Sequence, residues 1–163
     1  MARFVHLTHE SAAKKIQRTG IRRNRTRFGV VGVYATPVMP NFYATHQWLR
    51  DLKRRGHRVI VGVYFKIPDE EVVMVGHYNN SHRSVMAAEA VDIVTRASDP
   101  RGYEVVIERS ISPKEIHKIR GLPQVVGWRY NPDAHGNPPC ACPVCLTPGE
   151  FKAADIRRRF GNE

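Results

Sequence analysis

The chain has 163 residues, a length that fits one domain with at most a small appendage. Its hydrophobic content of 42% is enough for a folded core, yet no stretch approaches the roughly 18 apolar residues of a membrane span. The formal net charge is +11, and the three cysteines lie too close together for a disulfide framework. We therefore expect a basic, soluble, cytoplasmic protein with no signal peptide.

The positive charge is concentrated at the N-terminal end of the chain. Residues 1–60 contain thirteen Lys or Arg and only two acidic residues, so this part carries the whole excess, and the remainder has equal numbers of bases and acids. A concentrated basic field attracts polyanions, including nucleic acids and phosphate-bearing cofactors. The simpler interpretation is a surface whose charge keeps the protein in solution.

The chain opens with a predicted strand and a predicted helix. Residues 3–8 alternate weakly between apolar and polar types, which indicates a strand. Ser11 is a suitable N-cap for a short helix over 11–20, and Gly20 is a typical residue at a helix C-terminus. A basic, irregular loop is expected at 22–29.

Three further elements are predicted before the middle of the chain. Residues 30–37 are rich in β-branched types and predict a strand that Pro37 ends. Residues 41–56 have the spacing of an amphipathic helix that ends at Gly56. A long apolar strand is expected at 58–68.

The second half of the chain is predicted to be mostly strands, at 70–78, 90–94, 103–108 and 124–130. The Ser-Pro pair at 112–113 predicts the start of a helix over 112–119, and a terminal helix is expected over 148–160. Because the few helices do not alternate strictly with the strands, the pattern indicates an α+β fold and argues against a doubly wound sheet.

Three short strings in this pattern carry a resemblance to a known family. They are "HLT" (6–8) before "AAKKIQRTGI", "GVYATP" (32–37) before "NFYATH", and "YEVVIERSISPKEIHKI" (103–119). In this order and spacing they resemble the His-Tyr-Glu branch of the ADP-ribosyltransferases, which includes diphtheria toxin and the poly(ADP-ribose) polymerases. The opening strand and helix look still more like the DNA-modifying ADP-ribosyltransferase toxins. The resemblance covers residues 3–120 and implies a split β-sheet core with few short helices.

The resemblance also implies NAD as a substrate and gives individual residues their roles. His6 matches the histidine that hydrogen-bonds the ribose beside nicotinamide, and Thr8 matches the hydroxyl residue two positions later. Tyr34 matches the tyrosine of the triad, and Tyr43 the second aromatic residue that closes on nicotinamide. Glu104 matches the catalytic glutamate at the start of a core strand.

These roles suit the chemistry of breaking the bond between nicotinamide and ribose. An aromatic ring holds the flat nicotinamide by stacking, and a carboxylate stabilises the ribose cation and accepts a proton from the nucleophile. Leu7 replaces the glycine of the polymerases at a position whose backbone binds the carboxamide, and the DNA-modifying toxins also have a branched residue there. Glu89 is the alternative catalytic carboxylate. The simpler interpretations are a surface histidine, core tyrosines and a solvent-facing glutamate.

The cysteines form a separate motif near the C-terminus. Cys140, Cys142 and Cys145 are held close together by prolines, and three thiolates suit a tetrahedral zinc ion. His135 is the nearest candidate for the fourth ligand. We expect a structural zinc knuckle, with three unliganded thiols as the alternative. The predicted domain organisation is a catalytic domain over 1–130, and a Cys-rich loop and terminal helix over 131–163 packed on it.

The expected function is mono-ADP-ribosylation of DNA or RNA by a bacterial or phage toxin or defence effector. The residues expected to contact nucleic acid are the basic side chains after the two predicted helices, Arg22, Arg23, Arg25, Arg27, Lys53, Arg54 and Arg55. An antitoxin or immunity protein is a further expected partner. Three alternatives stay open: an ADP-ribosyltransferase that modifies proteins, an RNA 2′-phosphotransferase of the same fold, and a non-catalytic nucleic-acid-binding module.

Overall fold

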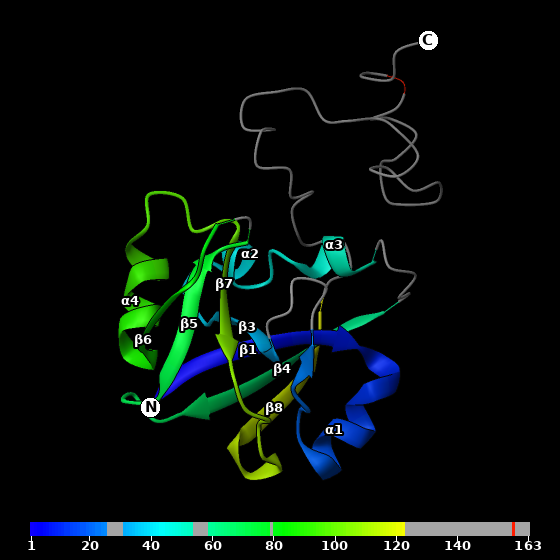
Figure 1. Ribbon diagram of the computed structural model, residues 1–163. Helices are drawn as coiled ribbons and strands as arrows, with labels where there is room; N and C mark the ends of the chain where they lie inside the picture. The colour runs from blue at the N-terminus through cyan, green and yellow to red at the C-terminus, as the bar shows by residue number, and fades with distance from the viewer. Residues whose placement is uncertain (26–30, 54–58, 79, 123–157, 159–163) are drawn as a thin grey trace.

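The computed structural model describes residues 1–25, 31–53, 59–78, 80–122 and 158 (Figure 1). The strands are β1 (Ala2–His9), β2 (Asn24–Arg25), β3 (Val31–Pro37), β4 (Ile60–Ile67), β5 (Val72–His77), β6 (Arg83–Met86), β7 (Tyr103–Ile107) and β8 (Ile116–Gly121). The helices are α1 (Ala13–Thr19), α2 (Phe42–Thr45), α3 (Leu49–Lys53) and α4 (Ala87–Arg96), with 3₁₀ turns η1 (Glu10–Ala12) and η2 (Pro113–Glu115).

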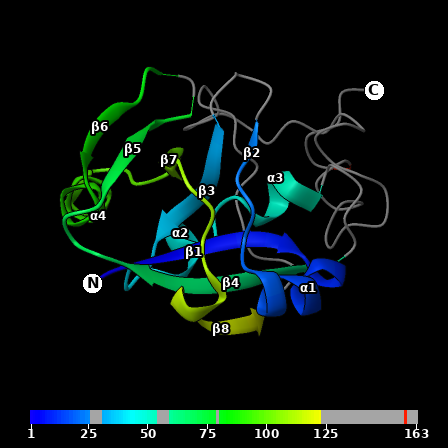
Figure 2. The same ribbon diagram turned by 60° about the horizontal axis from the view of Figure 1, so that its bottom comes forward.

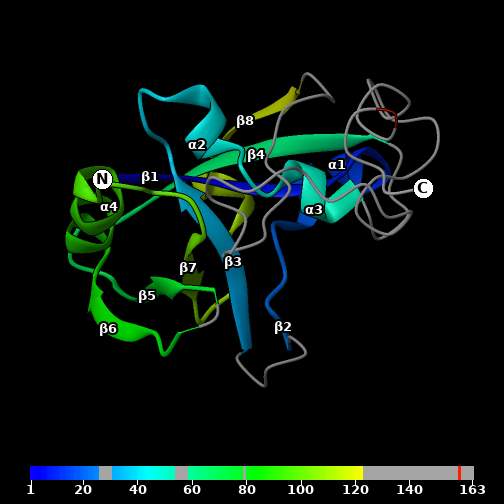
Figure 3. The ribbon, with the colours of Figure 1, turned by 90° about the horizontal axis from the view of Figure 1, so that it is seen from above.

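The strands form an eight-stranded, antiparallel sheet in the order β6-β5-β7-β3-β1-β4-β8, with β2 paired to β3. Strand β1 pairs with β4 along its whole length but with β3 at only two positions, Phe4 with Pro37 and Val5 with Thr36. Figures 2 and 3 show β3 crossing β1 steeply, whereas β1 and β4 run side by side. The sheet is therefore divided between β1 and β3. The predicted α+β class is confirmed.

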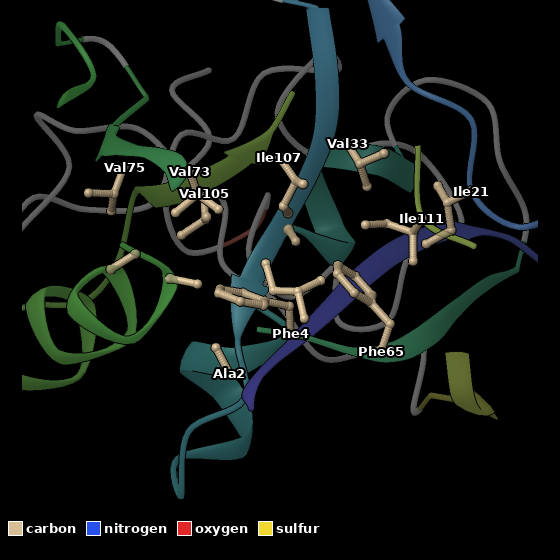
Figure 4. Packing of buried hydrophobic residues seen from close by; sticks show 14 of the residues in the cluster. Ala2, Phe4, Ile21, Val33, Phe65, Val73, Val75, Val105, Ile107 and Ile111 are labelled. Atoms are coloured by element: carbon tan, nitrogen blue, oxygen red, sulfur yellow. The ribbon is translucent and has the colours of Figure 1, made fainter. Parts of the chain in front are cut away.

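The main hydrophobic core joins the two parts of the sheet to α4. Phe4 of β1 and Phe65 of β4 are fully buried with their ring centroids 6.0 Å apart, and Ile107 of β7 packs in the same cluster (Figure 4). A second cluster of Val5, Leu7, Leu49, Ile60 and Leu122 lies against α3. Since β1 alternates between the two clusters, this strand is buried on both faces.

The predicted helix over 41–56 is interrupted, because side chains at its centre bond to distant groups. The imidazole of His46 donates to the Phe42 carbonyl at 2.7 Å and accepts from the Tyr64 hydroxyl at 2.7 Å. The amide of Gln47 donates to the Pro100 carbonyl and accepts from the Gly102 backbone N–H. These contacts separate α2 from α3 and anchor the segment beside the start of β7.

Two predicted elements are wrong. The expected strand at 90–94 lies inside α4, where Ala87, Ala90 and Val94 are buried at helical spacing. The expected helix at 112–119 is only the turn η2 followed by β8. There a capping box between Ser112 and Glu115 closes the turn, and β8 then supplies the pairing partner of β4.

A close approach at Gly20 joins the end of α1 to the segment after β7. Ile21 and Ile111 exchange backbone hydrogen bonds of 2.9 and 2.8 Å. Gly20 has a φ of +79°, and a Cβ atom there would lie 2.0 Å from the Ile111 carbonyl oxygen. Glycine is therefore required at this position, and the contact holds the start of the basic segment next to the sheet.

None of the helices in these described segments is long and apolar enough to cross a membrane. The expected strand at 124–130, the Cys-rich loop and the body of the expected terminal helix lie outside the described residues.

Candidate functional site

A cleft of about 480 Å³ opens between β1 and β3, where the two strands separate. Its walls come from β1 and β3, from the segment at 22–25, from α3 and the residues before it, and from Tyr78 and Glu104. The volume lies within the roughly 300–1,000 Å³ that is typical of small-molecule sites. Four of the residues predicted for catalysis or NAD binding line this cleft, namely His6, Leu7, Tyr34 and Glu104.

His6 spans the point at which the strands separate. Its Nδ1 donates a hydrogen bond of 2.7 Å to the backbone carbonyl of Tyr34, which assigns the proton to Nδ1. Burial lowers the pKa of His6, so the ring is neutral at physiological pH. The remaining nitrogen, Nε2, is then a hydrogen-bond acceptor, which is suited to a hydroxyl group such as that of a ribose.

Glu104 enters the cleft from β7, the strand next to β3. Burial raises the pKa of its carboxyl group to about 7, and the side chain is only 18% exposed. The Nε2 atom of His82 lies 3.1 Å from Oε1 of Glu104. A carboxyl group whose pKa is near neutrality can accept a proton, and as a carboxylate it stabilises a nearby positive charge.

The aromatic residues in the wall differ in part from those predicted. Trp48 and Tyr78 line the cleft together with Tyr34, and the rings of Trp48 and Tyr78 meet edge to face with centroids 5.8 Å apart. The indole N–H of Trp48 donates to the Tyr103 carbonyl at 3.3 Å. Tyr43 is 59% exposed on α2, packs edge-on against Phe42, and is not among the residues that line the cleft.

Neither Trp48 nor Tyr78 was identified as a site residue from the sequence. The apolar spacing of Trp48 suggested the inner side of a helix, and Tyr78 stands at the end of an apolar strand with no motif around it. Their place in the wall becomes visible only in the folded chain, where Trp48 before α3 and Tyr78 after β5 come into contact at the cleft.

A smaller cleft of about 280 Å³ adjoins the first and shares His6, Arg22 and Asn24 with it. Thr8, expected near the ribose, lines this second cleft, as does Lys15. Through these three shared residues the two clefts connect the region of Glu104 with the helix after β1.

The predicted basic residues occupy different places. Arg22 and Arg25 line the main cleft. Arg23 does not, because its side chain donates to the Glu108 carbonyl and its backbone N–H to the Ser110 hydroxyl. Lys53 is the last residue of α3, outside both clefts. Arg27, Arg54 and Arg55 lie outside the described residues.

The alternative carboxylate, Glu89, is exposed in the first turn of α4 and does not line either cleft. The expected zinc ligands Cys140, Cys142, Cys145 and His135 also lie outside the described residues. Within the part of the chain that the structure describes, no three His, Cys, Asp or Glu side chains are grouped as a metal site.

Comparisons of the chain with protein-family models, with curated proteins and with solved structures found no match.

Proposed function

We propose that the protein is an NAD-dependent mono-ADP-ribosyltransferase that modifies DNA or RNA. The observation that carries this proposal is that His6, Tyr34 and Glu104, from the three adjacent strands β1, β3 and β7, line one cleft. The resemblance identifies these three residues as the His-Tyr-Glu triad. They are distant in the sequence, so their presence in one cleft supports the resemblance independently of the motifs.

The side chains present suit the steps of the proposed reaction. Nε2 of neutral His6 accepts a hydrogen bond from a ribose hydroxyl, and the aromatic wall of the cleft stacks on nicotinamide. The glycosidic C–N bond breaks, and nicotinamide leaves with the bonding electrons. The acceptor atom then forms the new bond to the ribose carbon and gives its proton to the carboxylate of Glu104, which also stabilises the positive charge that develops on the ribose.

The acceptor is proposed to be a nucleic acid because of the charge around the cleft. Arg22 and Arg25 line its wall, and the whole excess positive charge of the chain lies in residues 1–60. NAD has only two phosphates and does not require so many cationic side chains. The phosphate backbone of a nucleic acid binds such side chains with release of counterions. Such an enzyme would act as a toxin or defence effector, and an antitoxin or immunity protein would be its partner.

The test is transfer of label from NAD carrying a radioactive ADP-ribose group. The purified protein is incubated separately with RNA, single-stranded DNA, duplex DNA and a cell-protein extract at low salt. Label on a nucleic acid supports the proposal. The Glu104→Gln variant keeps the shape of the side chain but not its charge, so transfer should fall by at least ~10²-fold while the fold is retained. Glu89→Gln is the matched control and should retain transfer.

Three results would contradict the proposal in different ways. Label on protein alone would favour a protein acceptor. Removal of an RNA 2′-phosphate in the presence of NAD would favour the phosphotransferase alternative. Nucleic-acid binding without any release of nicotinamide would indicate a non-catalytic binding module.

A further inference from the structure

His82 approaches Glu104 from the turn between β5 and β6, a contact that no sequence motif indicates. Its Nε2 lies 3.1 Å from the Oε1 atom of Glu104, and the two side chains are only 14% and 18% exposed. Within the described part of the chain, this Nε2 is the one buried side-chain nitrogen or oxygen that has no well-aligned hydrogen bond. The imidazole is therefore close enough to bond to the carboxyl group, although the two groups are not well aligned for a hydrogen bond.

The backbone of β5 makes room for this imidazole. Gly76 stands directly opposite Glu104 in the β5–β7 register. A Cβ atom on Gly76 would lie 3.0 Å from the Cα of His82 and 3.1 Å from its Cγ. A side chain at position 76 would push against His82 and shift it by a few tenths of an ångström. Glycine at the position opposite Glu104 in the sheet therefore lets His82 approach without this crowding.

We propose that His82 is a positioning residue, whose Nε2 holds Oε1 of Glu104 so that Oε2 is directed at the reacting groups in the cleft. The inference rests on the proposed function, because it concerns how Glu104 acts in ADP-ribosyl transfer. The two atoms are within hydrogen-bond reach, and a substrate bound in the cleft would tighten the contact. The contact with His82 also restricts the rotamers of Glu104.

The kinetics of nicotinamide release test the role of His82. The His82→Ala variant keeps Glu104 but removes the side chain that positions its carboxyl group. We therefore expect kcat to fall by about 10–100-fold, the scale expected when a catalytic group is misplaced by ~1 Å. KM for NAD should change little, because His82 is not among the residues that line the cleft. His82→Gln places an amide nitrogen near the position of Nε2 and should restore most of kcat.

Two controls separate positioning from a general effect on the fold. His117, exposed on β8 at the far end of the sheet, is the matched histidine, and His117→Ala should leave kcat unchanged. In the Glu104→Gln background, adding His82→Ala should cause no further loss, because a residue that acts through Glu104 has no effect once the carboxylate is removed. Circular dichroism spectra and melting temperatures identify any variant that fails to fold.

The outcomes distinguish this inference from the proposed function. If the wild-type protein releases nicotinamide and folded His82→Ala does so at the same kcat, the positioning role is wrong and the proposed function stands. The role is also wrong if His82→Ala lowers kcat equally in the wild-type and Glu104→Gln backgrounds. If the wild-type protein releases no nicotinamide, the proposed function falls and this inference falls with it.

Discussion

At the scale of single residues, burial changes the acidity of the Glu104 carboxyl group. The same carboxyl group in water has a pKa of 4.5, and burial raises it to about 7 because the charged form loses its hydration. A proton acceptor works best when its pKa is near the operating pH. The burial that suits this group for catalysis also has a cost in stability, and the two effects can be measured separately.

The proposed catalytic role of Glu104 predicts that kcat depends on pH. If Glu104 acts as a carboxylate, kcat for ADP-ribosyl transfer should fall as pH decreases through about 7, where the group becomes protonated. Below that pH the loss should approach about ten-fold per pH unit, the slope for a single required carboxylate. Rates measured from pH 5.5 to 9 test this, and the residual rate of Glu104→Gln should lack the same inflection. A wild-type profile that is flat between pH 5.5 and 8 would contradict the assignment.

The stability of the protein should change in the opposite direction. Because the folded-state pKa of Glu104 is raised, the stability that its protonated carboxyl group contributes is fully present below pH 4.5 and is lost as pH rises through about 7. Above that pH the buried carboxylate destabilises the fold. Glu104→Gln removes this destabilisation and should raise the free energy of unfolding by up to about 3 kcal/mol at pH 8. Near pH 4.5 the two proteins should be equally stable. Urea unfolding at both pH values provides the measurement, and a variant less stable than wild type at pH 8 would contradict the burial argument.

At the scale of elements, contacts between segments that are distant in the chain place the walls of the cleft. Gln47 ties the α2–α3 segment to Gly102, two residues before Glu104. Arg109, just after β7, bonds to both Glu71 and Glu115, and these hydrogen bonds lower the pKa of Glu115. The backbone hydrogen bonds between Ile21 and Ile111, which we call the Gly20 junction, hold the end of α1 against the segment that follows β7.

The Gly20 junction can be tested by adding one methyl group. Gly20→Ala should destabilise the fold by at least ~2 kcal/mol, because the backbone there has a conformation that is almost restricted to glycine and the Cβ would clash with the Ile111 carbonyl oxygen. Gly121→Ala is the control, since a Cβ there meets no atom within 4 Å, and its effect should be within about 0.5 kcal/mol. Thermal unfolding compares the two. Equal melting temperatures would show that the junction contributes little.

At the scale of the whole molecule, the distribution of charge determines the proposed choice of acceptor. Residues 1–60 carry the entire excess of positive charge, and they provide all of the residues that line the cleft except Tyr78 and Glu104. The remaining residues contain equal numbers of bases and acids, so they do not compensate this positive charge.

Binding of nucleic acid should therefore weaken steeply with salt. Replacing both Arg22 and Arg25 by Ala should lower the slope of log affinity against log salt concentration by about 0.7–0.9 for each phosphate that the variant no longer neutralises. The variant should also reduce nucleic-acid modification more than NAD hydrolysis. The double variant Lys114→Ala, Lys118→Ala removes two exposed charges near β8 and is the control. Fluorescence anisotropy from 50 to 300 mM salt measures the slopes, and equal slopes for both variants would exclude these arginines from the interface.

The cysteine motif predicts about one zinc ion per chain. Elemental analysis of protein purified without chelators tests this, and Cys142→Ser should lower the zinc content and the resistance of the C-terminal segment to proteolysis. NAD cleavage should be less affected, because the proposed reaction assigns no role to a cysteine. Freshly prepared, reduced protein that contains no zinc would contradict the knuckle.

Several elements could be predicted because their signals are local. The strands expected at 3–8, 30–37 and 103–108 match β1, β3 and β7, since β-branched content and turn residues are properties of neighbouring positions. These strands carry His6, Tyr34 and Glu104, so the candidate site was identified from short motifs. The expected strand at 90–94 failed because its β-branched content was used in place of the helical spacing of buried residues on α4.

The amino-acid sequence was sufficient to predict the α+β class, the concentration of positive charge and the motifs that contain the proposed triad. Three features required the folded structure: the separation of β1 and β3 after two residue pairs, the place of Trp48 and Tyr78 in the cleft wall, and the contact of His82 with Glu104. The physical reason is that propensity and periodicity depend on neighbours in the chain. Strand pairing, burial and the pKa of a carboxyl group depend on segments that meet only when the protein folds.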